Sequence, residues 1–287
     1  MHISTWKTWI VSAVVTTALA VGAIAVTSEE SDAAPVGATV SVASSTAVTT
    51  PVTAAVPTTA ALDAIATDAR FSVSVLDVDT GESLSYGSGA FDTASIVKVD
   101  ILAALLWQHQ QAGTTLSTSE LALASAMIER SDNGAATTLF EAVGGEDGLE
   151  SFNDLVGLES TDVGSDGNWG LTQTTADDQV RLLEVVLGDG ALLTPTSQAL
   201  ARGLMSDVVD GQRFGVVAAA DDADAAALKV GYLQRSTTGL WDVTSIGEIE
   251  AGGHTYLVAV LSNGSTTFDD GVALVDAVAR AAVDQTA

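Results

Sequence analysis

The period of hydrophobic and polar residues changes twice along the C-terminal four fifths of the chain. Residues 70–87 alternate apolar and polar side chains around Asp79-Thr80-Gly81, a pattern that predicts a β-hairpin. From Ser95 to about Val209 the apolar residues recur at helical spacing, and clusters of Gly, Asp and Asn separate the segments. The predicted helices cover residues 95–111, 118–130, 134–143, 148–156, 175–187 and 195–207.

The strand pattern returns towards the C-terminus. Three strands are predicted at residues 227–233, 240–251 and 254–264, followed by an amphipathic helix at 269–283, and a short helix at 61–70 precedes the hairpin. The five strands can pair in one antiparallel sheet, which terminal helices cover and into which a helical lobe is inserted. The expected fold class is therefore α/β of the α+β kind, with a cleft between sheet and lobe.

The N-terminal part of the chain has a different composition. An apolar run at 9–26 comes after Lys7 and precedes acidic residues, which is typical of a cleaved secretory signal or of a single membrane anchor. This charge polarity favours export of the residues C-terminal to the run. Residues 33–61 are all Ala, Val, Thr, Ser, Pro or Gly, as in a flexible tether. We therefore predict a signal peptide or membrane anchor at 1–32, a linker at 33–61 and a folded domain at 62–287.

Composition excludes several functions. The chain carries 37 acidic and 10 basic residues, a formal net charge of −27, so nucleic acid is not an expected partner and the only expected membrane contact is the N-terminal segment. There is no cysteine, which excludes disulfides, a thiol nucleophile and cysteine metal sites. The histidines His2, His109 and His254 are scattered, which argues against a metal centre. We expect a monomer with no cofactor.

A lysine lies where a hydrophobic helix should be apolar. After Lys7 the chain has two lysines, Lys98 and Lys229. In Ser95-Ile96-Val97-Lys98, positions i and i+3 share a helix face, so the amine is expected near the Ser95 hydroxyl. Burial would lower the lysine pKa, and a neutral amine can accept the serine proton. Taken alone, the motif also fits an N-cap serine and a lysine that extends to solvent.

A second motif, Ser131-Asp132-Asn133, falls between two predicted helices. Ser131 could pass a proton to a leaving group there, and Asn133 could hold a substrate amide. Taken alone, the motif also fits a helix–helix turn with a capping residue.

A third motif, Lys229-Val230-Gly231, lies on the first of the three C-terminal strands. A lysine between apolar residues favours an edge strand, and Gly231 would let a ligand backbone approach closely. The backbone N–H of Tyr232 could then form an oxyanion hole together with that of Ser95.

The order and context of the three motifs resemble those of the penicillin-recognising serine hydrolases, specifically the class A β-lactamase-like branch. The shared pattern is S-x-x-K at a helix start, S-D-N between helices and a K-x-G triplet on a strand. The resemblance extends over roughly residues 62–286. It implies a β-lactamase-like α/β/α sandwich, an antiparallel five-stranded sheet with an inserted helical lobe, in agreement with the periodicity.

The resemblance also implies roles for the motif residues. Ser95 would be the acylated nucleophile, Lys98 its base or relay, and Ser131 the proton shuttle to the leaving nitrogen. Asn133, Gly231 and Tyr232 would border the substrate, Tyr232 through the oxyanion hole that it shares with Ser95. Lys229 would add positive potential for a substrate carboxylate and for the Ser131 proton.

The chain departs from the family pattern in three respects, one of which is a shorter segment between Ser95 and Ser131. Val230 occupies the position where the family normally has Ser or Thr to bond the substrate carboxylate. No E-x-x-L-N stretch precedes residues 171–183, where the family carries its deacylating glutamate. Asp162 and Asp166 are the nearest carboxylates in the sequence, and Asn168 could position a water. The sequence therefore leaves open whether any carboxylate replaces the missing glutamate.

These observations predict an exported or membrane-tethered serine hydrolase. It would form an acyl-enzyme with a β-lactam or a related, peptidoglycan-like amide and release the acyl group slowly. Two alternatives keep the same fold: a non-catalytic cell-envelope or ligand-binding module, and an esterase for small acyl esters.

Export is a prediction of the N-terminal segment alone. When a bacterial host expresses the full chain, the folded domain is expected outside the cytoplasmic membrane, either tethered or released. Cell fractionation and mass determination of the N-terminus check this, with a variant that begins at Leu62 as the control expected to fold without export. A soluble cytoplasmic product that retains Met1 would contradict the prediction.

Overall fold

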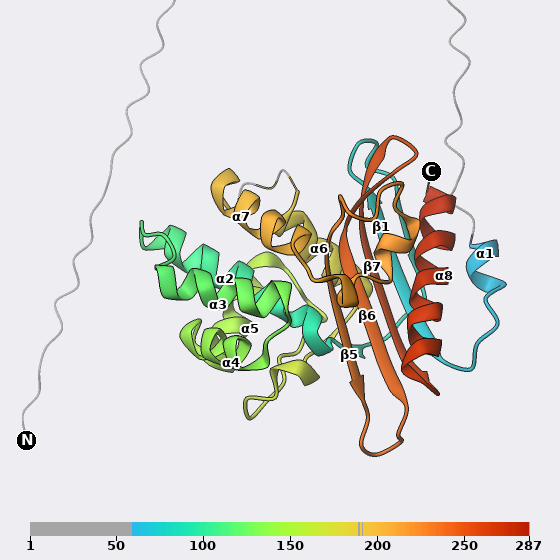
Figure 1. Ribbon diagram of the computed structural model, residues 1–287, viewed down its shortest axis with the longest axis horizontal. Helices are drawn as coiled ribbons and strands as arrows, with labels where there is room; N and C mark the ends of the chain where they lie inside the picture. The colour runs from blue at the N-terminus through green and yellow to red at the C-terminus, as the bar shows by residue number, and fades with distance from the viewer. Residues whose placement is uncertain (1–58, 189, 191, 287) are drawn as a thin grey trace, which may run out of the picture. The chain divides into compact units, whose positions relative to one another are not determined.

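Residues 59–188, 190 and 192–286 are described by a computed structural model of the chain (Figure 1). The predicted N-terminal signal or anchor and nearly all of the predicted linker lie outside these residues. Of the helices that the structure describes, none combines the length and the apolar character that crossing a membrane requires.

The observed elements occur in the predicted order. The helices are α1 (Ala60–Asp63), α2 (Val97–Gln111), α3 (Thr118–Glu129), α4 (Asn133–Ala142), α5 (Gly145–Val156), α6 (Ala176–Val186), α7 (Pro195–Ser206) and α8 (Phe268–Thr286). The strands are β1 (Arg70–Asp77), β2 (Ser83–Tyr86), β3 (Phe91–Asp92), β4 (Gln173–Thr174), β5 (Ala227–Gln234), β6 (Trp241–Ala251) and β7 (His254–Ser265).

One antiparallel sheet joins strands from both ends of the described chain. Its order is β2-β1-β7-β6-β5, so the N-terminal hairpin pairs with the last strand. Val73 of β1 lies opposite Val260 of β7 in this register. The prediction of a single five-stranded sheet is therefore confirmed, and β5, which carries Lys229, is an edge strand as expected.

Helices cover the sheet on both faces. Helix α8 packs on one face and contacts α1, whereas α6 packs on the other face, beside the lobe formed by α2 to α5 and α7 (Figure 1). Residues 256–261 of the central strand β7 are fully buried, because both of its faces contact helices. On α8 the buried residues recur at helical spacing, among them Leu274, Val278 and Ala282, which explains why its period could be recognised in the sequence.

Two local expectations need correction. The predicted helix at 61–70 is limited to α1, and Arg70 already belongs to β1. The sequence also did not indicate the pairing of β3 with β4, since two-residue strands have no detectable period. This pairing, extended by the bond from Thr93 N to Thr172 O (2.8 Å), connects the segment before Ser95 to the segment before α6.

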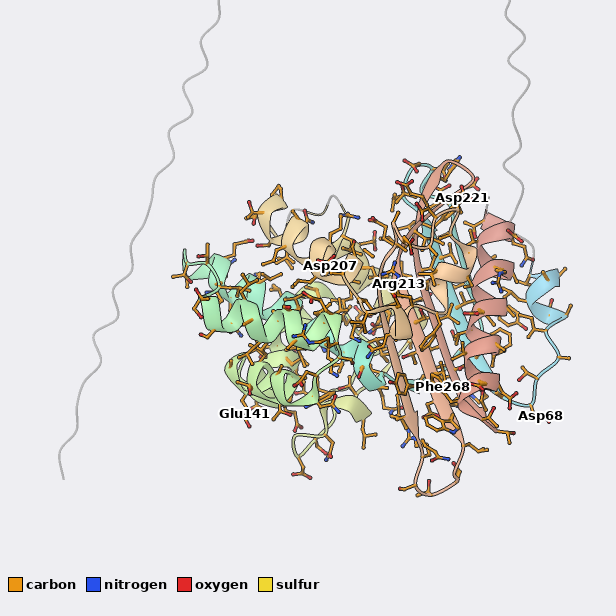
Figure 2. All side chains as sticks on the ribbon, in the orientation of Figure 1. Asp68, Glu141, Asp207, Arg213, Asp221 and Phe268 are labelled. Carbon is orange, nitrogen blue, oxygen red and sulfur yellow. The ribbon has the colours of Figure 1, made fainter. Side chains whose placement is uncertain are left out.

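The acidic residues are mostly at the surface. Glu141, Asp207 and Asp221 are exposed, and Glu141 and Asp221 lie near the outline of the folded part in Figure 2. Solvent there hydrates their charges at little cost. Most of the negative charge thus lies at the surface, although a few aspartates, among them Asp92, Asp100 and Asp242, are buried.

Candidate active site

Ser95 lies at the junction between sheet and lobe. A 3-10 turn, Ala94–Ile96, connects β3 to α2, and Ser95 is half-buried in this turn. Ala94 has a φ of +47°, in the left-handed region that residues with a Cβ rarely adopt. Such backbone strain persists only where the surroundings impose it, and it is concentrated at functional sites.

The amine of Lys98 contacts oxygen atoms from two segments. Its Nζ lies 3.0 Å from Ser95 Oγ, 2.8 Å from Ser131 O, 3.0 Å from Ser131 Oγ and 2.7 Å from Asn133 Oδ1. Ser131 has a φ of +57°, and both its carbonyl and its hydroxyl contact the amine. The first two sequence motifs therefore meet at one nitrogen atom.

Burial lowers the pKa of Lys98. The side chain has no exposed surface, and desolvation lowers its pKa to about 8, against the opposing attraction of Asp132. The ring of Trp169 lies 5.0 Å from Nζ and encloses the amine further. At pH 7 roughly one tenth of Lys98 is therefore uncharged, far more than at the ordinary lysine pKa.

Lys229 is buried as completely as Lys98. Its Nζ donates to Val230 O at 3.2 Å. Burial, and then repulsion by the Lys98 charge, lower the pKa of Lys229 to about 7. The two lysines of the described chain thus influence each other electrostatically, although 131 positions separate them in the sequence (229 − 98).

Gly231 presses directly against the backbone that carries Ser95. A Cβ on Gly231 would lie 2.6 Å from Ser95 N, Thr93 O and Thr244 Oγ1. The buried Thr244 hydroxyl donates to Thr93 O (3.0 Å) or Gly231 O (3.2 Å) across this contact. The Cβ side of Gly231 is therefore filled by the chain's own backbone, and the expectation that a ligand approaches Gly231 stays a prediction.

A cleft of about 400 Å³ opens beside Ser95. The 3-10 turn, α4, the segment 167–171 and the end of β5 contribute to its walls. Ser95, Asn133 and Tyr232 line it, whereas Lys98, Ser131 and Lys229 are not among its lining residues. The expected cleft between sheet and lobe is thus present at the predicted residues.

The two carboxylates that lie nearest in the sequence to the missing deacylating glutamate do not line the cleft. Asp162 bonds to Gln173 through its backbone and is exposed, and Asp166 is exposed in a turn with a φ of +56°. Asn168 does line the cleft, with its Nδ2 donating to Ser165 O at 2.9 Å. Within the described residues, no Asp or Glu belongs to the cleft walls.

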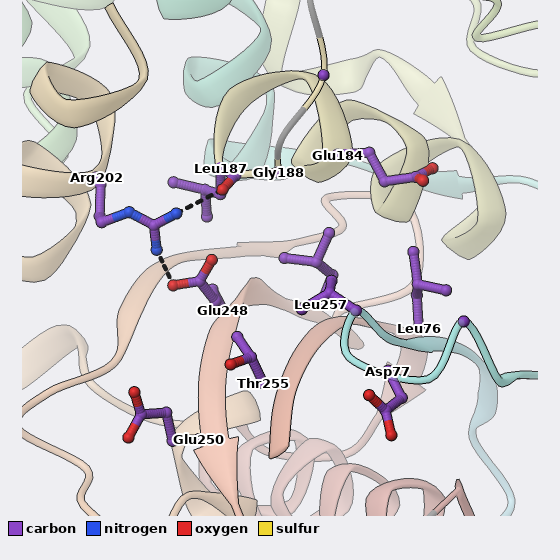
Figure 3. A pocket seen from close by; sticks show the side chains of 13 residues that line it. Leu76, Asp77, Glu184, Leu187, Gly188, Arg202, Glu248, Glu250, Thr255 and Leu257 are labelled. Atoms are coloured by element: carbon purple, nitrogen blue, oxygen red, sulfur yellow. Dashed lines mark hydrogen bonds and ion pairs between the residues drawn. The ribbon is translucent and has the colours of Figure 1, made fainter. Parts of the chain in front are cut away.

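A larger cavity, of about 620 Å³, lies elsewhere in the fold. Figure 3 shows Arg202 between Glu248 and the carbonyl of Leu187, with further acidic side chains around them. None of the three sequence motifs contributes to its walls. The volume of a cavity therefore does not identify the active site here. The smaller cleft, which Ser95 and Asn133 line, is the candidate active site.

The sequence did not reveal two residues of the site. Trp169 encloses the Lys98 amine and bonds through Nε1 to Thr137 Oγ1 (3.2 Å), and Thr244 bridges the Gly231 contact. Trp169 begins a 3-10 turn, Trp169–Leu171, which is too short for a period to indicate its orientation. Thr244 is an ordinary strand residue, and only its pairing opposite Gly231 shows its position.

With this geometry established, comparison with known proteins identifies the family. The family model described as "Beta-lactamase enzyme family" matches residues 106–286. The chain belongs to this family. The match includes the second and third motifs and begins after Ser95 and Lys98. The pairing of these two residues rests instead on the 3.0 Å contact between Lys98 Nζ and Ser95 Oγ.

Relatives by sequence and by structure agree with the family. The protein named "Putative lipoprotein LppW" from Mycobacterium tuberculosis is 33% identical over 161 residues, 54% of this chain, as is its namesake from Mycobacterium bovis. The chain spans about half the length of these relatives, 51%.

Solved structures show the same fold. A class A β-lactamase from Bacteroides cellulosilyticus has a TM-score of 0.65 at 20% identity, covering 76% of this chain and 91% of that one. A β-lactamase from Xanthomonas campestris has a TM-score of 0.62 at 23% identity, covering 77% and 93%. The fold expected from the sequence is therefore confirmed as the β-lactamase fold.

The buried Lys229 predicts a pH-dependent stability. Its pKa falls from 10.5 to about 7 on folding, so between these values the folded state binds fewer protons than the unfolded state. Wild-type stability should accordingly rise with pH across this window. Lys229→Met removes this contribution. We expect the free energy of unfolding of the variant minus that of the wild type to be greatest at pH 6–7 and to decline towards pH 10.

Urea unfolding of both proteins at several pH values measures the difference. Arg130→Gln is the matched control, because it also removes one positive charge but from a side chain that is 57% exposed. The control difference should be independent of pH. A Lys229→Met difference that is the same at pH 7 and pH 10 would contradict the assigned pKa shift.

Proposed function

We propose that this protein is an exported serine hydrolase that forms an acyl-enzyme at Ser95 with a β-lactam or a related amide. The observation that carries the proposal is the contact of the buried Lys98 amine with Ser95 Oγ at 3.0 Å. A nucleophile and a base within hydrogen-bonding distance are the minimum for this chemistry. The lipoprotein name of the mycobacterial relatives supports a location in the cell envelope.

The neighbours of Lys98 suit an uncharged amine. Ser131 O and Asn133 Oδ1 can only accept hydrogen bonds, whereas the Ser95 and Ser131 hydroxyls can also donate. A neutral amine has two N–H groups and one lone pair. Two N–H bonds to the carbonyl oxygens would leave the lone pair for a hydroxyl proton, so Lys98 acts as the general base for Ser95.

In the proposed acylation, Ser95 Oγ bonds to the substrate carbonyl carbon as its proton passes to Lys98 Nζ. The N–H groups of Ser95 and Tyr232 stabilise the oxyanion. The carbon–nitrogen bond then breaks, and the proton reaches the leaving nitrogen through Ser131 Oγ, which lies 3.0 Å from Lys98 Nζ. By resemblance to the family, Lys229 contributes positive potential to this proton transfer.

Slow deacylation is expected from the composition of the cleft walls. Hydrolysis of the ester needs a water and a base to take its proton. Asn168 can bind a water but accepts no proton, and no described wall residue carries a carboxylate. The acyl-enzyme should therefore accumulate.

A non-catalytic ligand-binding module of the cell envelope is the second candidate. The same absence of carboxylates from the described cleft walls favours it. The two functions differ in one observable, namely whether a covalent bond forms at Ser95.

We expect a penicillin to add its full mass to the protein at Ser95. Intact-mass spectrometry and subsequent peptide mapping measure the adduct. The acylation rate should rise with pH through about 8, because Lys98 must lose its proton to act as the base. Ser95→Ala should remove labelling without unfolding the protein, and Lys98→Met should slow it by about 10²–10⁴-fold.

Thr137→Ser serves as a matched control, since it changes a cleft residue but leaves the Lys98 contacts intact. Labelling of Ser95→Ala at another serine would refute the site assignment. An acylation rate unchanged in Lys98→Met would show that the lysine has a structural role only.

Turnover of a chromogenic penicillin is expected to be biphasic. A burst equal to one product per active site should precede a slow steady state, because a missing general base costs roughly 10²–10⁴-fold in deacylation. Stopped-flow absorbance measures both phases. Fast hydrolysis without a burst would contradict this prediction, and Asp162→Asn and Asp166→Asn would then test whether either carboxylate acts as the base.

A further inference from the structure

The walls of the Ser95 cleft are electrically neutral. Among the described residues that line it, none is Asp, Glu, Lys, Arg or His. The polar side chains are amides and hydroxyls, such as Asn133 and Asn168, and the apolar walls include Trp169 and Leu233. A ligand in this cleft therefore contacts dipoles and apolar surface, without a charged partner.

Neither buried lysine offers a ligand in the cleft a direct salt bridge. Lys98 and Lys229 have no exposed surface. The Lys98 amine is surrounded by four oxygen atoms of the chain, and Lys229 donates to Val230 O. The buried Val230 itself has no group that could bond a carboxylate.

The basic residue at the end of β5 is already neutralised. Arg235 comes directly after β5, two residues after the cleft residue Leu233. Its guanidinium forms ion pairs with Asp92 and with Asp242, the latter at 3.0 Å. Both carboxylates are buried, so the charge of one arginine is balanced by two fixed anions.

The field of the whole protein adds to this effect. The net charge of −27 repels anions from the surface as they approach. A carboxylate that leaves water for the cleft would lose its hydration without gaining a salt bridge. An uncharged ligand experiences neither cost.

We propose that the acyl donor of this site is an electrically neutral amide or ester with an apolar group, an inference that rests on the proposed function. Asn133 uses Oδ1 for Lys98 and Asn168 uses Nδ2 for Ser165, so Nδ2 of Asn133 and Oδ1 of Asn168 remain to bond a neutral amide. Trp169 and Leu233 contact the apolar group. The donor acylates Ser95 Oγ, and its leaving amine or alcohol takes up the serine proton.

A pair of esters that differ in one charge tests the proposal. The probes are the phenyl ester of N-phenylacetylglycine and the same ester with a carboxylate at the meta position of the leaving phenol. Phenol release and intact mass give kcat/KM for acylation, corrected for the reactivity of each ester with hydroxide. We expect the uncharged ester to react at least about tenfold faster, which corresponds to about 1.4 kcal/mol.

A second measurement assigns the preference to the cleft. Leu233→Lys introduces a cation into the wall and should raise kcat/KM for the carboxylate ester about tenfold relative to the uncharged one. Leu233→Gln introduces a polar side chain without a charge, as a control for Leu233→Lys. It should leave the ratio of kcat/KM for the two esters unchanged. An unchanged ratio in Leu233→Lys would show that charge does not set the preference and would overturn the proposal.

The remaining outcomes separate this inference from the proposed function. If the carboxylate ester acylates Ser95 as fast as the uncharged ester or faster, the inference fails while the acyl-enzyme function stands. If neither ester nor a penicillin acylates Ser95, the proposed function fails, and the inference fails with it.

Discussion

The contacts of the Lys98 amine are the interaction on which the rest of the site depends. A fully buried amine requires polar partners, and here one turn between α3 and α4 and one serine on the sheet side supply all four. Because Ser95 directly precedes α2 and Asn133 begins α4, a single nitrogen connects the starts of two helices of the lobe. The left-handed backbone at Ser131 accompanies this arrangement, since its carbonyl and hydroxyl both contact the amine.

The edge strand holds Ser95 from the opposite side. The missing side chain of Gly231 lets β5 approach Ser95 N and Thr93 O so closely that a Cβ would overlap both. Thr244, on the neighbouring strand, bonds across this contact. The position of the proposed nucleophile is therefore set by backbone packing, which is stiffer than side-chain contacts and preserves geometry when a ligand enters.

The fold separates charge in a consistent way. Most acidic side chains occupy the surface, the two described lysines are buried with lowered pKa values, and the cleft beside Ser95 has neutral walls. Desolvation makes each buried ammonium unfavourable, and their mutual repulsion adds to it for Lys229. The same burial that destabilises the fold near neutral pH thus provides an amine able to accept a proton.

The sequence pattern determined the order of elements and predicted the single antiparallel sheet and the proximity of Ser95 and Lys98, whereas the family resemblance implied that Ser131 and Asn133 join them. Periodicity and helical spacing are local properties, so they can be recognised in the sequence without knowledge of distant contacts. Tertiary structure alone decided the β3–β4 pairing, the contact of Gly231 with Ser95, the enclosure of Lys98 by Trp169 and the neutralisation of Arg235 by Asp92. Each of these joins segments distant in the sequence, and no local pattern records which of the chain's many glycines or aspartates will meet a given partner once the sheet has formed.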